Sequence, residues 1–153
     1  MPQYLDDFIP GVKYNGVNAR VYGSSGNTTL SPTWSGSTML FDTAAGITYT
    51  LPKPSIGAQF NFIITATVTS SNHKIITDAS TTFMQGILMM GGASDTAGLF
   101  HGNGTSHVAI TMNGTTTGGI LGTEINLYCL TSTLWEAEGV VLGSNIVTPW
   151  ATS

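Results

Sequence analysis

The chain has 153 residues and a formal net charge of −4, and only 8% of its residues are charged, against about 25% in an average soluble domain. Hydrophobic residues make up 41% of the chain, and 57 of the 153 residues are Gly, Ser or Thr. This composition excludes a disordered chain, which combines low hydrophobicity with high charge, and a helical bundle, which is rich in Ala, Leu, Glu and Lys. We therefore expect one β-rich domain that stays soluble through hydroxyl groups.

The charge pattern restricts the partners that the chain can have. Its 4 basic residues are scattered singly, which predicts no nucleic-acid partner and no binding to a membrane surface. No apolar run approaches the ~18 residues of a membrane-spanning helix, and the amino terminus lacks the basic start and apolar run of a signal peptide. A single cysteine excludes an intramolecular disulfide. We expect synthesis in a cytoplasm.

Residues 1–36 mix Pro, Gly, Asn and Ser with isolated large apolar residues and follow neither the helical nor the strand period. This pattern indicates an extended N-terminal arm whose large side chains dock on another surface, and a frayed terminus is the alternative. The arm residues that we expect to serve as anchors in an interface are Tyr4, Leu5, Phe8 and Ile9.

Residues 37–142 contain the strand signals. Within Ala58–Thr69, apolar residues from Phe60 to Val68 alternate with polar residues such as Gln59 and Asn61, which predicts a half-buried strand. Shorter alternations predict further strands around Ile47–Leu51, Val108–Met112 and Ile125–Cys129. We expect a hairpin turn with positive φ at Asn113-Gly114 and no convincing helix, although Ser94–Phe100 could form one turn with Ser94 as its cap.

The segment Phe83–Met90 is apolar on both faces of a strand, so both faces should be covered. The second cover is either a neighbouring subunit or a loop or arm of the same chain. We assign Met84, Leu88 and Met90 to a face that contacts a neighbouring subunit or a shell protein. Residues 143–153 form a short C-terminal tail, and we expect Trp150 to be docked as the anchor of this tail.

Strands at about ten-residue spacing with such turns predict an all-β fold. We expect a single compact antiparallel β-sandwich or barrel, jelly-roll-like, over residues 37–142, with the arm 1–36 before it and the tail 143–153 after it.

No group of residues in the sequence indicates catalysis. The chain has no nucleophile elbow, and Cys129 lies on the apolar face of its strand, as a core residue would. The spacing of Asp95, His101 and His107 matches no metal motif. Glu136 and Glu138 share one face of a strand, where an outward acidic face is the simplest interpretation. We therefore expect no enzyme, no metal and no cofactor.

Carbohydrate binding stays open as an alternative. Trp34, Trp135 and Trp150 could supply stacking platforms, and the polar surface could supply neutral hydrogen bonds. Ordinary use of these aromatic residues in the core and in interfaces is the simpler interpretation.

Two segments carry motifs with a wider resemblance. In Gly46–Ile76, a strand runs into Leu-Pro, and a spacer and a Gly lead to Phe-x-Phe and a Thr-rich strand that ends in Asn-His-x-Ile. This segment resembles small structural proteins of tailed bacteriophages, some of which are capsid decoration (cement) proteins. Leu127–Val140 is similar to the closing hairpin of the same group, with Ser132-Thr133 in place of the usual Asp-Gly turn.

The resemblance implies a compact β-sandwich or barrel without enzymatic activity, commonly assembled as a trimer on the outer capsid surface. Its partners would be the major capsid protein and two further copies of itself, and it would stabilise the shell by clamping neighbouring capsid proteins. The mild acidity of the chain suits basic surfaces of a shell protein. The alternative is a receptor- or carbohydrate-binding module of a tail or head fibre, because such fibre proteins carry similar modules.

Overall fold

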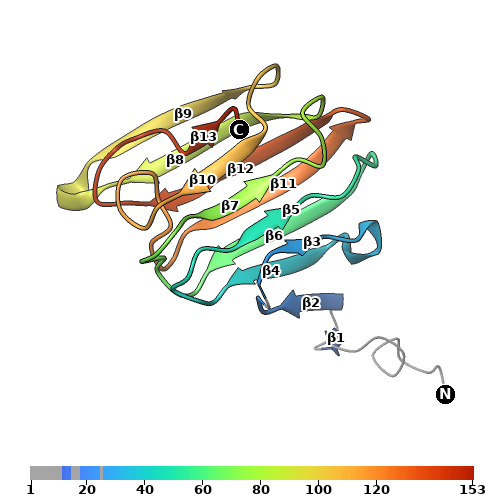
Figure 1. Cartoon of the computed structure of the whole chain (residues 1–153), viewed down its shortest axis with the longest axis horizontal. Coiled ribbons are helices and arrows are strands. Elements are labelled where there is room, and N and C mark those ends of the chain that lie inside the picture. The colour runs from blue at the N-terminus through green and yellow to red at the C-terminus, as the bar shows by residue number, and fades with distance from the viewer. Residues whose placement is uncertain (1–11, 15–17, 25) are drawn as a thin grey trace.

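Short strands with alternating apolar residues build the whole fold, which the computed structural model describes over residues 12–14, 18–24 and 26–153. Two mixed sheets pack face to face as a sandwich (Figure 1). The larger sheet has the order β1 (Val12–Tyr14), β2 (Asn18–Tyr22), β4 (Ser37–Phe41), β6 (Gln59–Ile64), β11 (Glu124–Thr131), β12 (Leu134–Leu142), β8 (Phe83–Gly91) and β9 (Ala97–Asn103). The smaller sheet has the order β13 (Trp150–Ala151), β10 (Ala109–Met112), β7 (His73–Ile76), β5 (Thr48–Thr50) and β3 (Thr28–Thr29). The all-β class and the sandwich are therefore confirmed, and the described strands do not close into a barrel.

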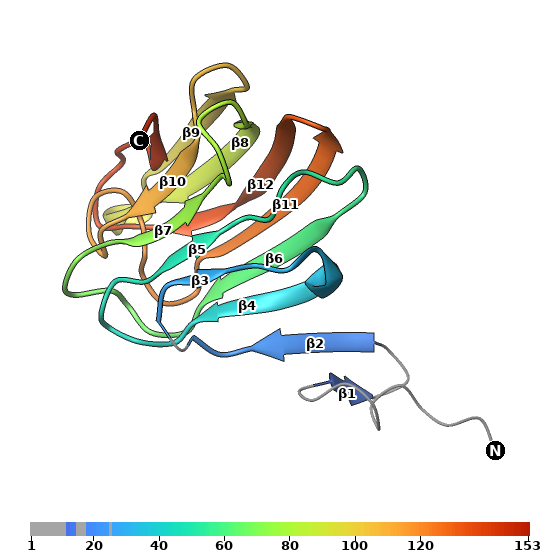
Figure 2. The ribbon, with the colours of Figure 1, turned by 45° about the vertical axis from the view of Figure 1, so that its right-hand side comes forward.

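The first half of the chain winds around the core and passes from one sheet to the other with each strand, an arrangement that we call the coil. From β2 to β7 the strands alternate between the two sheets, so that β2, β4 and β6 are parallel neighbours in one sheet and β3, β5 and β7 in the other (Figure 2). Parallel neighbours arise here because each connection crosses to the opposite sheet, whereas a hairpin would turn back beside its own strand. The expectation of an antiparallel jelly roll is wrong for this half.

The coil also uses part of the segment that was expected to be an arm. Strands β2 and β3 lie within residues 1–36, yet β2 pairs with β4 and β3 pairs with β5. Residues 21–22 and 28–29 of the predicted arm are therefore part of the two sheets.

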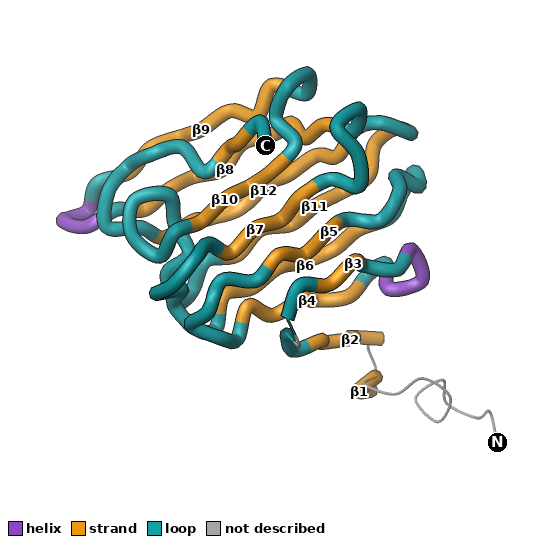
Figure 3. The backbone as a smooth tube through the Cα atoms, in the orientation of Figure 1, coloured by secondary structure: helices purple, strands orange, loops and turns teal. Residues whose placement is uncertain are grey.

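The second half begins with β8, which lies parallel to β12 and antiparallel to the edge strand β9. The hairpin β11–β12 turns at Ser132-Thr133, as the sequence resemblance implies. Gly114 has the predicted positive φ of 78°, but Asn113-Gly114 is not a hairpin turn, because β10 and β11 belong to different sheets. Where Ser94–Phe100 could form one turn, the structure has a short 3-10 turn at Ala93–Asp95, and β9 follows it (Figure 3).

The interior between the sheets is aromatic at its centre. The ring centroids of Phe41 and Tyr49 lie 4.9 Å apart, and those of Tyr49 and Phe62 lie 5.7 Å apart. The Tyr49 hydroxyl donates to the backbone oxygen of Leu40 at 2.8 Å. Burial, together with the nearby charge of Asp42, raises the pKa of Tyr49 to about 12. The alternation predicted for Ala58–Thr69 is confirmed over β6, where Phe60, Phe62 and Ile64 are buried, but the strand ends at Ile64 and does not continue to Thr69.

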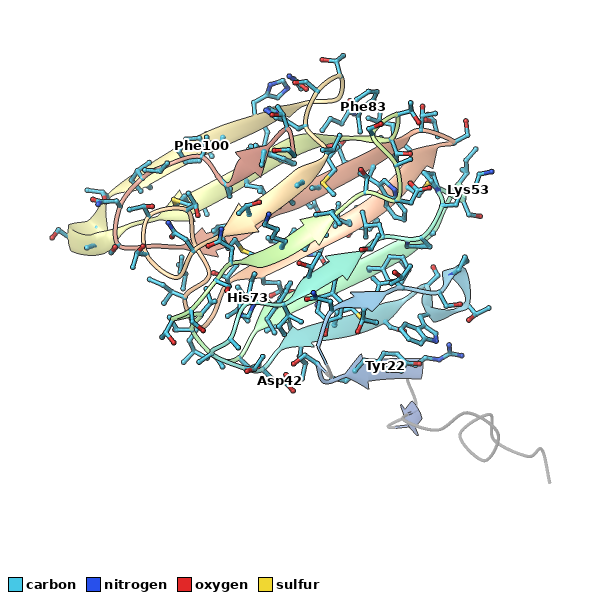
Figure 4. All side chains as sticks on the ribbon, viewed as in Figure 1. Tyr22, Asp42, Lys53, His73, Phe83 and Phe100 are labelled. Carbon is cyan, nitrogen blue, oxygen red and sulfur yellow. The ribbon has the colours of Figure 1, made fainter. Side chains whose placement is uncertain are left out.

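The C-terminal tail completes the interior where the smaller sheet ends. Trp150 is 6% exposed, and its Nε1 donates to the backbone oxygen of Phe100 at 3.1 Å. Its ring stacks on His107 with centroids 5.6 Å apart, and Phe100 is labelled on β9 in Figure 4. Docking of Trp150 is therefore confirmed, and the contacts that bury its ring are with its own domain.

Candidate interaction surface

The outer face of the larger sheet is the broadest surface that the strands present. The side chains of alternate residues point away from the smaller sheet, and in the described residues no third layer covers them (Figure 2). Two parts of this face differ in chemistry. One part lies on β8, β9 and β12 and the other on β4, β6 and β11.

The first part is an apolar patch of four side chains. Ile87 and Met89 on β8 are 53% and 45% exposed. The strand register places Met89 beside Leu99 of β9 and beside Val140 of β12, which are 71% and 39% exposed. Single exposed apolar residues are ordinary, whereas neighbouring ones on three paired strands indicate a surface that binds another molecule.

The rim of the apolar patch is mainly acidic. Glu138 on β12 pairs with Ile87, and Glu124 on β11 pairs with Val140. On the other side, His101 of β9 is the register partner of Ile87. A partner for this patch should therefore combine an apolar centre with a basic rim.

Three predicted interface residues lie on the opposite side of β8. Met84, Leu88 and Met90 are 0% exposed, so the assignment of these side chains to a contact face is wrong. The parallel register explains why, because it sets Met84 beside Trp135 and Met90 beside Val141, which are both buried. The predicted arm anchors lie outside the described residues: Tyr4, Leu5, Phe8 and Ile9.

The second part of the outer face is a small cleft, which we call the amide cleft. In the register, Gln59 of β6 pairs with Tyr128 of β11, and Asn61 pairs with Asn126. Gly36 lies next to Gln59, to whose backbone oxygen its N–H donates at 2.8 Å. Since Gly36 has no side chain, the sheet is hollowed beside the four larger residues, and the resulting cleft has a volume of about 200 Å³.

The polar groups of the amide cleft have few internal partners. Across the described part of the chain, no hydrogen bond engages the side-chain amides of Gln59, Asn61 and Asn126. The Oδ1 atom of Asn61 is buried and has no partner. The Tyr128 hydroxyl donates to Oε1 of Glu138 at 3.4 Å. Tyr128 is 36% exposed, and its ring faces outward. The sequence marked Gln59 and Asn61 only as part of a solvated strand face.

The residues considered for catalysis or metal binding do not form a joint site among the described residues. The predicted core role of Cys129 is confirmed, since it is 3% exposed and burial raises the pKa of its thiol. Asp95 precedes β9 and His107 follows it, whereas His101 points outward from this strand. Within the described ranges, no three His, Cys, Asp or Glu side chains could jointly hold a metal ion.

The tryptophans considered as stacking platforms for a sugar are used inside the fold. Trp135 is 0% exposed, so it cannot touch a ligand. Trp34 stacks on Tyr22 with centroids 4.8 Å apart and packs against the core. Of the aromatic residues described on this outer face, Tyr128 is the one that presents its ring to the amide cleft.

One buried histidine lies between the sheets, away from both surfaces. His73, which is labelled in Figure 4, lies on β7 and is 0% exposed, and its Nδ1 accepts a hydrogen bond from the backbone N–H of Ile47 at 3.2 Å. Its Nε2 has no partner, and its ring packs on Phe41 with centroids 4.5 Å apart. Burial lowers the pKa of His73, so the neutral imidazole is part of the core.

The described chain contains no helix long and apolar enough to cross a membrane. No family model matches the sequence, and no curated protein and no solved structure is significantly similar to it.

Proposed function

We propose that this chain is a structural protein of a bacteriophage virion, a capsid decoration (cement) protein that binds the outer capsid surface. The apolar patch is the observation that carries the proposal. Four adjacent exposed apolar side chains on three paired strands are unfavourable in water. In a protein that binds a shell through this face, contact with the shell would cover them. The proposed function is not enzymatic and needs no cofactor.

The partner we propose is the major capsid protein. The acidic rim of the patch, with Glu124 and Glu138, fits basic residues around an apolar site on the shell. The net charge of −4 disfavours contact with packaged DNA. The sequence resemblance of Gly46–Ile76 and Leu127–Val140 to phage structural proteins points to the same partner.

A homotrimer is part of the proposal. Each patch alone is small, and linking three copies raises the strength of attachment without any new contact. Such a protein would be made in the host cytoplasm and would then clamp neighbouring capsid proteins on the assembled shell. Native mass spectrometry at micromolar concentration tests this part, with a trimer expected and a monomer contradicting it.

Docking is tested by cosedimentation with empty capsids of the phage that encodes the chain. The double variant Met89→Lys/Leu99→Lys places two charges in the apolar patch, and we expect binding to fall at least about tenfold, because each lysine would have to be desolvated. The matched control is Gln59→Lys, which adds a positive charge to the same face outside the patch and should change binding less than about twofold. Equal binding by the double variant and the unchanged protein would contradict the proposal.

A further inference from the structure

We propose that the amide cleft binds a neutral saccharide. The cleft lies on β4, β6 and β11, whereas the apolar patch lies on β8, β9 and β12. The inference goes beyond the proposed role on a shell and does not depend on it.

The geometry of the cleft suits one sugar ring and its substituents. Gln59 and Asn61 are two residues apart on one strand, as are Asn126 and Tyr128 on the next, so the four side chains form a rectangular array. Its sides are about 7 Å along the strand and about 5 Å across. Gly36 leaves the end of this array open, and the hollow of about 200 Å³ has the size of a small polar ligand.

The chemistry of the lining residues matches hydroxyl groups. Each side-chain amide offers a carbonyl acceptor beside an NH₂ donor, and a sugar hydroxyl both donates and accepts. The amides of Gln59, Asn61 and Asn126 make no other hydrogen bond among the described residues. The Oδ1 of Asn61 is buried and lacks a donor, so this amide has unused hydrogen-bonding capacity beside Asn126.

Tyr128 adds the apolar half of sugar recognition. Its hydroxyl lies 3.4 Å from Oε1 of Glu138, and its ring, on a residue 36% exposed, is available to a ligand. An aromatic ring with one polar end is suited to the C–H face of a sugar whose rim forms hydrogen bonds.

Two other ligand classes fit less well. An anionic sugar or a phosphate would need cations, but the lining side chains are uncharged and Glu138 lies beside Tyr128. An extended peptide binds by adding a strand to a sheet edge. The backbone of β6 is already paired with β4 on one side and β11 on the other, so no edge is available at the cleft.

Titration of the full-length ¹⁵N-labelled chain, followed by NMR, tests the site. The neutral probes are maltohexaose, cellohexaose, mannohexaose and chitohexaose, and the contrasting probes are an alginate hexamer and a Gly-Ser hexapeptide. We expect at least one neutral probe to shift the side-chain NH₂ signals of Asn61 and Asn126 with a millimolar Kd. Asn126→Ala and Tyr128→Ala should each raise that Kd about tenfold.

The matched control is Gln85→Ala. Gln85 is an amide on the same outer face, but its Nε2 already donates to Glu136 at 2.7 Å, so its loss should change the Kd less than about twofold. The spectrum of each variant without ligand shows whether the variant is folded. If Asn126→Ala is unfolded, Asn126→Gln replaces it in the titration.

Three results would overturn the proposal: no shift with any of the four neutral probes, equal binding of the hexapeptide or of the alginate hexamer, or an equal loss of binding in Gln85→Ala. The role on a shell is measured separately by cosedimentation of the patch variants. A failure of the saccharide site is therefore distinguishable from a failure of the proposed function.

Discussion

The amide cleft and the apolar patch lie on the same face of the same sheet, but they are supported from below in different ways. Beneath the cleft lie full-sized aromatic side chains, with the centroids of Phe60 and Trp135 6.1 Å apart. Beneath the patch, glycines of β9 let the C-terminal tail approach the sheet, since a Cβ atom on Gly98 would lie 2.4 Å from Ile146 and one on Gly102 2.8 Å from Trp150. The tail covers the inner face of the larger sheet where the smaller sheet has no strand. The strands that carry the patch are therefore supported by residues from the C-terminal end of the chain.

The tail should therefore matter most for the half of the sheet that carries the patch. We expect Trp150→Ala to lower the free energy of unfolding by about 3–5 kcal/mol, because it empties a nearly filled space and removes a buried hydrogen bond. Urea unfolding measures this loss. Hydrogen exchange should then show weaker protection of the β9 amides and little change on β6. A loss below about 1 kcal/mol, or an equal effect on both strands, would mean that the tail does not support the patch.

One glycine in each part of the sheet allows the backbone under the patch to be compared with the backbone at the cleft. Gly86 under the patch has φ +116°, and a Cβ atom there would lie 2.0 Å from the backbone oxygen of Ala137. Gly36 at the cleft has φ +85°, but a Cβ atom there would meet nothing within 4 Å. We expect Gly86→Ala to cost at least about 2 kcal/mol and Gly36→Ala about 1 kcal/mol, since only the first adds a clash to the backbone strain. Thermal unfolding of both variants checks the order, and a larger loss for Gly36→Ala would contradict it.

The buried histidine makes the coil half sensitive to acid. Because the folded-state pKa of His73 is lowered from its ordinary 6.5, the unfolded chain takes up a proton at a higher pH than the folded one. Stability is therefore complete above about pH 6.5 and declines as the pH falls toward the folded-state pKa. Burial also lowers the pKa of His107, with a further contribution from the neighbouring His101, so His107 adds to the same decline.

Unfolding free energies measured between pH 8 and pH 5 test this dependence. The variant His73→Gln should be less stable at pH 8 but should lose less between pH 8 and pH 5 than the unchanged protein. His101→Gln, on the exposed face of β9, is the control and should keep the part of the decline that comes from His73, losing only the contribution that His101 makes through His107. A decline that is unchanged in His73→Gln would rule out His73 as its main source.

The smallest expected effects on stability come from the side chains of the two surfaces themselves. Asn126→Ala in the cleft and Leu99→Ala in the patch should each change the free energy of unfolding by no more than about 0.5 kcal/mol, because neither side chain supports the core. Chemical denaturation measures both. A loss above about 1.5 kcal/mol in either variant would assign that side chain a structural role and would weaken its assignment to binding.

Sequence periodicity could predict the strands but not their partners. Alternation identified the buried residues of β6 and β11, because a half-buried strand imposes a period of two on its own sequence. The coil of parallel strands was missed because its turns differ in length: Val21 pairs with Thr38, whereas Thr48 pairs with Lys74. No fixed repeat is visible when connections vary in this way.

The surfaces were harder to predict than the strands. Phe83–Met90 is apolar on both faces, so the sequence could not say which face is inward, and the register with β12 decides it. The amide cleft needs residues from three strands and a glycine at one exact place beside Gln59. Two amides spaced two apart on β6 were a visible signal, but they acquire a meaning only when Asn126 and Tyr128 lie opposite them.

The apolar patch contains a methionine that reports directly on whether this surface is covered. Met89 is 45% exposed, whereas the other described methionines are buried at 0% exposure: Met39, Met84, Met90 and Met112. Dilute hydrogen peroxide should therefore oxidise Met89 before these four methionines in the free protein. Mass spectrometry of the protein bound to empty capsids should show Met89 oxidised at least about tenfold more slowly than in the free protein. An unchanged rate of Met89 oxidation in the bound protein would contradict docking through the apolar patch.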